Sequence, residues 1–257
     1  MRLPYHWYVR MRSIPLVLLL APCLLAGVQV RIEAVTRQTP ALLASLTPEQ
    51  RALLEKLNHA DIEHLAKLRA LVVPESWSQD EMAYSPLPET WPTARTSPKA
   101  LVIDLAAQVF GAYENGKLVR WGPVSTGTGV SRTMPGLYHL NWRSRSRRST
   151  VNPEWLMTWY YNFSSVDGNA MHAYSMPGFP ASHGCIRLLE RDAQWVYDWG
   201  EGWTLDEKSR LVTEGTPLLI TGEYRYGAPP PWRTPAWWTQ VIELPAMPAM
   251  ADRLQGK

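Results

Sequence analysis

Residues 99–125 decide the fold, and their sequence is KALVIDLAAQVFGAYENGKLVRWGPVS. The apolar runs Ala100–Leu105 and Val109–Tyr113 have the length and composition of two buried strands. The dipeptide Asn115-Gly116 follows the second run, and both residues accept the positive φ angles that a two-residue hairpin turn requires. This stretch therefore predicts a β-hairpin whose returning strand ends at Ser125.

The chain continues after the hairpin in short apolar runs that are separated by turn residues. The runs that predict further strands are Leu137–Asn141, Leu156–Tyr161, Ala170–His172 and Pro217–Thr221. Glu190–Trp199 predicts one helix instead, with Gly200 as its C-cap. We therefore expect a mainly β domain with a single helix.

The region before this domain is predicted to be helical and then extended. Thr47 and Gln50 form the pattern of a capping box. Leucine and valine side chains follow at helical spacing, which is broken at Asp61, so we expect one or two helices from Thr47 to Val73, as a stalk or as a lid on the main domain. Pro74–Pro98 contains five prolines and predicts a linker or a loop that follows the surface.

The N-terminus has the pattern of an export signal. Arg2, Arg10 and Arg12 precede the uncharged, largely apolar stretch Ile14–Val30. The stretch contains prolines and is short for a membrane span, so both a cleaved signal and a retained anchor stay open, with a buried core helix as the remaining alternative. The sequence thus predicts a periplasmic protein, either released or anchored in the inner membrane.

Composition and charge narrow the function classes. Of the 257 residues, 46% are hydrophobic and 19% are charged, as in a folded globular protein rather than a disordered one. The net charge of +3 gives little support to a nucleic-acid partner. Because Cys23 lies in the apolar N-terminal segment, Cys185 is the one thiol of the exported part. A lone thiol in an oxidising compartment is either buried and inert or kept for its reactivity.

Residues with catalytic chemistry gather around this thiol. His172 precedes it in the chain, and Ser182, His183 and Gly184 stand directly before it. A thiolate nucleophile, a histidine that takes its proton and neighbouring backbone N–H groups are the parts of an acyl transfer site. The alternatives are an ordinary buried cysteine, chance proximity and a Cys/His metal site, although no paired cysteine spacing supports a metal. Residue types and spacing alone leave the catalytic role open.

Lys99–Tyr224 resembles the catalytic domain of the L,D-transpeptidases, a family of bacterial cell-wall enzymes. The first hairpin and Pro123–Gly127 are similar to the start of that domain. Arg132–Gly136 resembles its threonine-proline-x-glycine element, with Met134 inserted. The most specific match is His172 together with Ser182-His183-Gly184-Cys185-Ile186-Arg187.

The resemblance implies a fold, a mechanism and a set of site residues. The fold would be β-sandwich-like, with Cys185 in a groove as the nucleophile. His172 would be the general base, oriented by the carbonyl of Ala173, and the N–H groups of His183, Gly184 and Cys185 would bind the oxyanion. The residues expected beside the substrate are Arg187, Ser182, Ala173 and Tyr174. No metal ion or other cofactor is expected.

Two further patterns have a structural and a functional interpretation. Arg143–Arg148 is a basic run that forms a solvated loop, or else recognises acidic groups on peptidoglycan stems or another anionic partner. A group of four aromatic residues either lines the groove or packs in the core. Its members are Trp155, Trp159, Tyr160 and Tyr161.

These observations predict a chain of four parts. They are a signal peptide or signal-anchor at 1–31, a helical region and proline-rich linker at 40–98, the catalytic domain at 99–225 and a Pro/Trp-rich extension at 226–257 that packs across the surface.

The predicted function is that of an L,D-transpeptidase, which forms a cysteine acyl-enzyme with peptidoglycan stem peptides and passes the acyl group to another stem or to a protein. The alternatives are a hydrolase of the same bonds and a non-catalytic peptidoglycan-binding protein. The expected partners are therefore stem peptides, a wall-attached protein and, through the N-terminal segment, the inner membrane.

Overall fold

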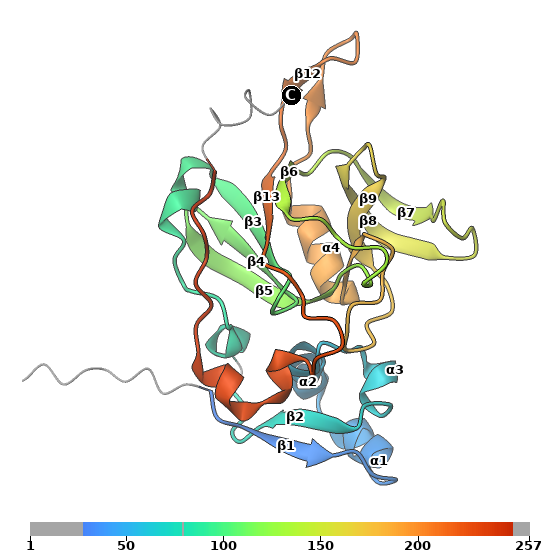
Figure 1. Cartoon of the computed structure of the whole chain (residues 1–257), viewed down its shortest axis with the longest axis vertical. Coiled ribbons are helices and arrows are strands. Elements are labelled where there is room, and N and C mark those ends of the chain that lie inside the picture. The colour runs from blue at the N-terminus through green and yellow to red at the C-terminus, as the bar shows by residue number, and fades with distance from the viewer. Residues whose placement is uncertain (1–27, 79, 249–257) are drawn as a thin grey trace, which may run out of the picture.

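The hairpin that opens the main domain is present as predicted. The computed structural model describes residues 28–78 and 80–248 (Figure 1). The three strands of the 99–125 stretch are β3 (Lys99–Asp104), β4 (Val109–Glu114) and β5 (Lys117–Ser125). Asn115 and Gly116 have φ angles of 49° and 75°, so the turn between β4 and β5 uses the positive φ values that these two residues tolerate.

Nine strands of the described residues form one curled sheet in the order β6-β13-β3-β4-β5-β10-β9-β8-β7. The other six are β6 (Gly136–His139), β7 (Arg143–Arg148), β8 (Leu156–Ser164), β9 (Asn169–Ala173), β10 (Ile186–Leu188) and β13 (Pro217–Thr221). Neighbouring strands are antiparallel except for the pairs β13 with β3 and β10 with β9. The mainly β class is confirmed, and all four of the later predicted strands occur with small shifts at their ends.

Helix α4 (Glu190–Trp199) packs inside the curl of the sheet (Figure 1). Its Ala193 and Val196 join a core cluster with Leu101 and Ile103 of β3. The helix has the predicted bounds and is followed by Gly200, which is extended rather than left-handed. A Cβ atom on Gly200 would lie 2.6 Å from a methyl carbon of Leu140, so a glycine is needed here for close packing.

A second core lies on the other face of the β3–β5 strands. Ala100 and Val102 point into it, because they alternate along β3 with the residues that face α4. The segment predicted as a linker or surface loop contributes Tyr84 and Trp91, with 3₁₀ turns at Glu81–Tyr84 and Pro92–Thr96. The C-terminal extension adds Trp232 and Trp238, and its 3₁₀ turns are Pro231–Arg233 and Pro235–Thr239.

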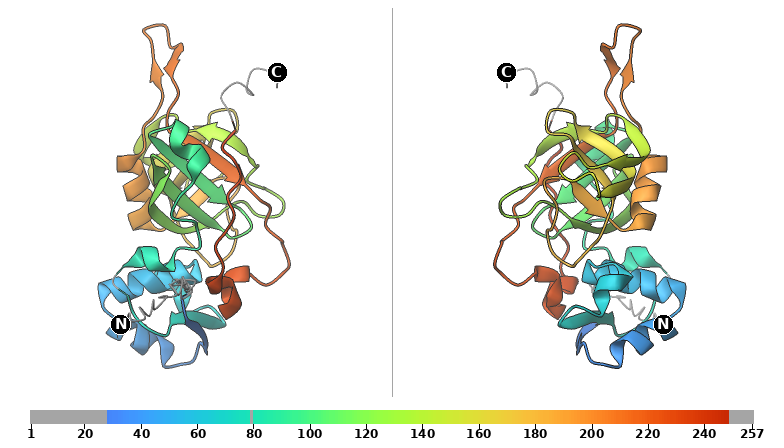
Figure 2. Two further views of the ribbon diagram at one scale, coloured as in Figure 1. Left: turned by 90° about the vertical axis from the view of Figure 1, so that its left-hand side faces the viewer. Right: turned by 90° about the vertical axis from the view of Figure 1, so that its right-hand side faces the viewer.

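The N-terminal region lies at one end of the molecule, beside the C-terminal extension (Figure 2). Its elements are β1 (Val30–Ala34), α1 (Thr39–Ser45), α2 (Pro48–Asn58), α3 (Ile62–Leu65) and β2 (Ala70–Pro74). The predicted capping box of Thr47 and Gln50 is present. The prediction of helix up to Val73 is wrong, because residues 70–74 form a strand in which Val72 pairs with Ile32.

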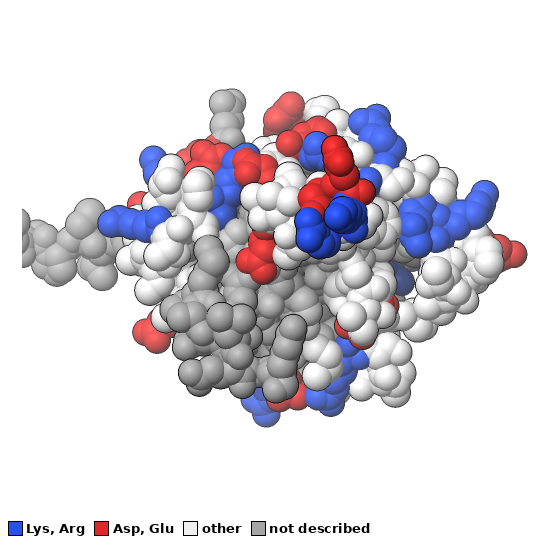
Figure 3. Space-filling model, turned by 90° about the horizontal axis from the view of Figure 1, so that it is seen from above, with Lys and Arg blue, Asp and Glu red and all other residues white. Residues whose placement is uncertain are grey.

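The basic run Arg143–Arg148 is a strand, not a loop, so that prediction is corrected. It forms the last strand of the sheet and pairs with β8, and its arginine side chains lie on aromatic rings of the same sheet. At the far end of the domain a small hairpin projects, formed by β11 (Thr204–Leu205) and β12 (Leu211–Thr213). Figure 3 shows basic and acidic side chains intermingled at this end.

The predicted export signal lies almost wholly outside the described residues, which include only its last part, where Val30 begins β1. Within residues 28–78 and 80–248, no helix is long and apolar enough to cross a membrane. The location of the protein therefore stays a prediction.

Candidate active site

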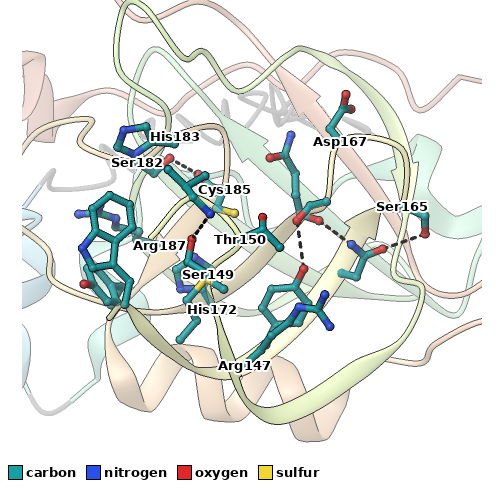
Figure 4. A pocket seen from close by; sticks show the side chains of 18 of the residues that line it. Arg147, Ser149, Thr150, Ser165, Asp167, His172, Ser182, His183, Cys185 and Arg187 are labelled. Carbon is teal, nitrogen blue, oxygen red and sulfur yellow. Dashed lines mark hydrogen bonds between the residues drawn. The ribbon is translucent and has the colours of Figure 1, made fainter. Parts of the chain in front are cut away.

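The parallel pairing of β9 with β10 places His172 directly beside Arg187. Residues in register on neighbouring strands project from the same face of a sheet. Cys185 stands two residues before Arg187, so its side chain is directed to that face as well. Figure 4 shows these three side chains around one pocket.

The two faces of β9 and β10 have different surroundings. Met171, Ala173, Ile186 and Leu188 belong to the core cluster around α4. The opposite face borders a cavity of about 190 Å³. Six of the predicted site residues line it, namely His172, Tyr174, Ser182, His183, Cys185 and Arg187. The strand alternation thus explains how residues from separate segments meet in one cavity.

His172 is buried and held in one orientation. Its Nδ1 lies 3.1 Å from the carbonyl oxygen of Ala173, and only a protonated Nδ1 can donate there. Burial lowers the pKa of His172 to about 4, and the nearby charge of Arg187 acts in the same direction, while the hydrogen bond to Ala173 opposes it. The ring is therefore neutral at pH 7, and its Nε2 carries the lone pair that can accept a proton.

The Cys185 thiol is also neutral at pH 7. Burial raises its pKa above the ordinary value, and the N–H of Ala170 and the charge of Arg187 offset part of this rise. The sequence predicts a thiolate nucleophile and a histidine that takes its proton. The structure instead places a neutral thiol and a neutral imidazole in one cavity, so the geometry favours proton transfer to His172 during attack rather than a preformed ion pair.

Arg187 is the fixed cation of this site. Its Nη1 donates to the carbonyl oxygen of Ser175 at 3.2 Å, and its guanidinium carbon lies 4.8 Å from the ring centroid of Tyr174. Both contacts hold the side chain on the cavity wall. A positive charge here stabilises the thiolate form of Cys185.

The turn before Cys185 is held by two hydroxyl groups. Ser182 Oγ donates to the carbonyl oxygen of Cys185 at 2.5 Å and accepts from the N–H of Gly184 at 3.2 Å. Thr133 Oγ1 donates to the carbonyl oxygen of Gly184 at 2.9 Å. Gly184 has a φ of 108°, and a Cβ on it would lie 2.8 Å from Asn169 Oδ1, so both conformation and space require glycine.

These contacts limit the predicted oxyanion hole. The N–H of Gly184 is engaged by Ser182, so it is not available in this conformation. Among the hydrogen bonds of the described residues outside the strand ladders, none uses the N–H of His183 or Cys185 as donor. Those two groups are therefore the candidates for binding an oxyanion.

One of the predicted residues, Ala173, has other surroundings than expected. Ala173 does not line the cavity, because its side chain packs in the core and its carbonyl oxygen is bonded to His172. We therefore correct its expected place beside the substrate. His183 is exposed, and its ring lies 5.2 Å from that of Trp155 at the cavity rim.

The members of the aromatic group at residues 155–161 lie on different faces of the sheet. Trp155 and Tyr160 line the cavity, whereas Tyr161 belongs to the core around α4. Trp159, with a φ of 53°, lies at a register shift between β8 and β9 and donates from its indole N–H to Glu190 of α4.

Several cavity residues were not singled out from the sequence. They are Trp142, Ser149, Thr150, Val151, Met157, Asn162, Ser165, Asp167, Gly168 and Asn169, whereas Arg147, which also lines the cavity, belongs to the basic run noted in the sequence. Most of them come from β7, β8 and the loops at their ends, and only the pairing of these strands with β9 brings them to the thiol. Within the described part of the chain, no group of three or more His, Cys, Asp or Glu side chains could hold a metal ion.

Comparison with solved structures gives similar proteins at low identity. One is an L,D-transpeptidase from Stackebrandtia nassauensis, with 22% identity over 50% of this chain and 57% of that one and a TM-score of 0.41. Another, from Mycobacterium smegmatis, has 20% identity, coverage of 49% and 59% and a TM-score of 0.39. Residues 123–326 of a Xylanimonas cellulosilytica L,D-transpeptidase match with 23% identity, 74% and 95% coverage and a TM-score of 0.46.

The chain spans less than two thirds of the length of the first two of these proteins. No curated protein matches the sequence. The family model that describes the L,D-transpeptidase catalytic domain, YkuD, matches residues 98–220. This stretch contains β3 to β10, α4 and most of β13, and it includes the cavity with His172, Cys185 and Arg187. Residues 98–220 therefore belong to the YkuD family of L,D-transpeptidase catalytic domains.

Proposed function

We propose that this protein is an L,D-transpeptidase that acts on peptidoglycan stem peptides through an acyl-enzyme on Cys185. The observation that carries the proposal is the cavity in which the thiol, the oriented neutral His172 and the cation of Arg187 meet. These are the groups that nucleophilic acyl transfer by a thiol requires. The family of the domain supplies the class of substrate.

The proposed first half-reaction begins with the thiol proton, which moves to Nε2 of His172 as the sulfur attacks a carbonyl carbon of the donor stem. The N–H groups of His183 and Cys185 stabilise the negative oxygen. The C–N bond after the diaminopimelate residue then breaks, and the leaving amine takes the proton from His172. A thioester on Cys185 remains.

In the second half-reaction an acceptor amine attacks the thioester and gives its proton to His172. The new amide forms, the thiolate leaves, and the proton returns to the sulfur. With water in place of the amine, the same steps hydrolyse the thioester. The first half-reaction is the same for both acceptors, so the distinction between transferase and hydrolase depends on which molecule reaches the thioester.

We place this reaction in the periplasm. The basic and then apolar N-terminal pattern supports export, and the family of the domain is associated with the cell wall. Fractionation of cells that express the full chain tests the location. Recovery of the full-length protein in the cytosol would contradict it.

Defined muropeptides test the function. The full chain is incubated with a purified tetrapeptide muropeptide, with and without an added amine acceptor, and the products are followed by mass spectrometry. A cross-linked or amine-capped product supports the transferase, and a shortened stem in both reactions supports the hydrolase. Binding without turnover would identify a non-catalytic peptidoglycan-binding protein and overturn the proposal.

A further inference from the structure

Arg147 is the arginine of the basic strand that lines the cavity. Strands β7 and β8 keep one register from Arg143 to Arg148, interrupted only by the missing pair of Arg145 with Trp159. The guanidinium of Arg145 lies over the ring of Trp159, with 4.0 Å between its central carbon and the ring centroid. Beyond the interruption, Arg147 pairs with Met157, and both line the cavity.

The other arginines of this strand have partners elsewhere. Arg143 donates to main-chain carbonyls at the end of α4, and Arg148 donates to the carbonyl oxygen of Pro153 at 2.9 Å. Arg147 lies on the rings of Trp142 and Tyr160, with its guanidinium carbon 4.9 Å and 5.6 Å from their centroids. No hydrogen bond or ion pair of the Arg147 side chain occurs in the described part of the chain, so its guanidinium N–H groups are free for a ligand.

The position of Arg147 connects it to the catalytic groups. The ring of Tyr160 that it covers also stacks on the ring of His172, with 6.3 Å between centroids and 15° between planes. Figure 4 shows Arg147 and Cys185 as parts of one pocket. A peptide attached to Cys185 would therefore lie in the same cavity as Arg147.

The chemistry of the lining defines the ligand. A guanidinium on an aromatic surface offers two parallel N–H donors, which match the two oxygens of a carboxylate. The second cation of the cavity, Arg187, is already engaged by Ser175 and Tyr174. Asp167 is the acidic side chain of the lining, and it accepts a hydrogen bond from Ser164. The guanidinium of Arg147 is thus the charged group of the lining that remains free, and it would bind an anion.

We propose that Arg147 binds a carboxylate of the donor stem peptide and makes the enzyme select stems in which this group is ionised over stems in which it is a carboxamide. This inference rests on the proposed function and adds a specificity residue to it. An amide has the same shape but no charge, so it loses the charge-assisted pairing with the guanidinium.

The test uses two tetrapeptide muropeptides that differ only in the side-chain carboxylate or carboxamide of diaminopimelate, with kcat/KM measured for the full chain. The wild type is expected to prefer the carboxylate by roughly 10- to 100-fold, as a charge-assisted hydrogen bond implies. Arg147→Gln is expected to abolish this preference by slowing only the carboxylate donor. Arg147→Lys keeps the positive charge but lacks the planar pair of donors, so this variant is expected to retain part of the preference for the carboxylate donor.

Arg145→Gln is the matched control, because it removes a neighbouring arginine that also lies on an aromatic ring but does not line the cavity. It is expected to leave the preference unchanged, and thermal melting checks that each variant is folded. Equal turnover of both donors by the wild type, or a preference that survives in Arg147→Gln, would overturn the inference while leaving the proposed function intact. No turnover of either donor would overturn the proposed function itself.

Discussion

Asp61 and Met176 are joined by two hydrogen bonds across the boundary between the N-terminal region and the catalytic domain. The N–H of Asp61 donates to the carbonyl oxygen of Met176 at 3.0 Å, and the N–H of Met176 donates to Asp61 Oδ2 at 2.7 Å. Met176 follows Ser175, whose carbonyl oxygen holds Arg187. The turn between α2 and α3 therefore holds the loop that positions the cation of the active site.

We expect Asp61→Ala to act on catalysis through this loop. Loss of the side-chain acceptor leaves the N–H of Met176 without its partner and loosens the contact between Ser175 and Arg187. We therefore expect kcat/KM to fall by roughly 10-fold through a higher KM. This change corresponds to about 1.4 kcal/mol, the size of one lost hydrogen bond. Steady-state kinetics with a muropeptide donor measure the effect.

Arg191→Gln is the control for this prediction, because Arg191 also joins the two regions, through Glu55 at 2.7 Å, but does not touch the loop. It is expected to lower the melting temperature with little change in KM. If both variants change stability and kinetics equally, Asp61 has a structural role only and does not position Arg187.

The two histidines are expected to have different roles. His172→Ala removes the proposed acceptor of the thiol proton and is expected to slow acylation by roughly 100- to 10,000-fold. His183 is exposed on Trp155 at the rim, so His183→Asn keeps most of the activity. The rate of acylation by a muropeptide donor, followed by intact-protein mass, compares them. An equal loss in both variants would contradict this assignment.

The pH dependence of acylation follows from the burial of His172. Its pKa of about 4 means that the ring accepts a proton from the thiol throughout the neutral range and loses this ability only when it becomes protonated near pH 4. The wild-type rate should therefore fall as the pH drops through about 4, not through the ordinary histidine pKa of about 6.5. An acid limb near 6.5 would show that His172 is not held in this buried, neutral state.

The hairpin and α4 could be predicted from the sequence because their signals are local. Asn115-Gly116 favours a hairpin turn whatever the flanking strands pack against. Residues 190–199 have the apolar spacing of a helix, and Gly200 follows its last residue. The basic strand β7 could not be predicted, because its run of Arg and Ser lacks the alternation of apolar and polar residues that indicates a strand. The rings of Trp142 and Trp159 cover its arginine side chains only in the folded protein. Likewise, Val72 continues a helical spacing but pairs with Ile32, far away in the chain.

The site residues likewise fall into two groups, those that the sequence indicates and those that only the folded structure reveals. His172 and Cys185 could be proposed because their segments carry a specific family pattern, whereas Arg147 comes to the cavity only through the pairing of β7 with β8 in the folded sheet. The protonation state of Cys185 could not be predicted for a related reason. The sequence shows a neighbouring histidine, but only the packed structure shows that His172 is too buried to carry a charge.

Gly184→Ala is expected to disable the site without removing any reactive group. The new side chain combines the strain of a positive φ with a contact at 2.8 Å from Asn169 Oδ1, which costs about 1–3 kcal/mol and shifts the neighbouring N–H groups. Gly227→Ala is the control, because Gly227 also has a positive φ but no atom near a new Cβ. If Gly184→Ala were as active as the control variant, the turn before Cys185 would not require a glycine.

Stability should fall with acid because of two buried histidines. Burial lowers the pKa of His59 to about 3 and that of His172 to about 4, so both are neutral when folded but take up protons below about pH 6.5 when unfolded. Their contribution to stability is complete above about pH 6.5 and is lost as the pH falls toward these folded values. Each adds a slope of at most about 1.4 kcal/mol per pH unit to the free energy of unfolding.

Urea unfolding between pH 4 and 7 tests this pH dependence in His59→Asn. Asn tolerates the left-handed conformation of His59 at the end of α2, so the capping geometry is kept while the titrating group and its stacking on Trp232 are lost. The variant should be less stable at pH 7 and have a shallower pH slope. His183→Asn serves as the exposed control, and equal slopes in both variants would count against the burial argument.

The most direct test of the account is the mass of the protein during turnover. Full chain mixed with a tetrapeptide muropeptide and quenched in acid should gain the mass of the donor minus its leaving amino acid, and peptide mapping should place this adduct on Cys185. Cys185→Ser, which keeps the size of the side chain but not the thiol, should show neither the thioester nor product. Product formation by Cys185→Ser at the wild-type rate, or an adduct on another residue, would contradict the claim that Cys185 is the nucleophile.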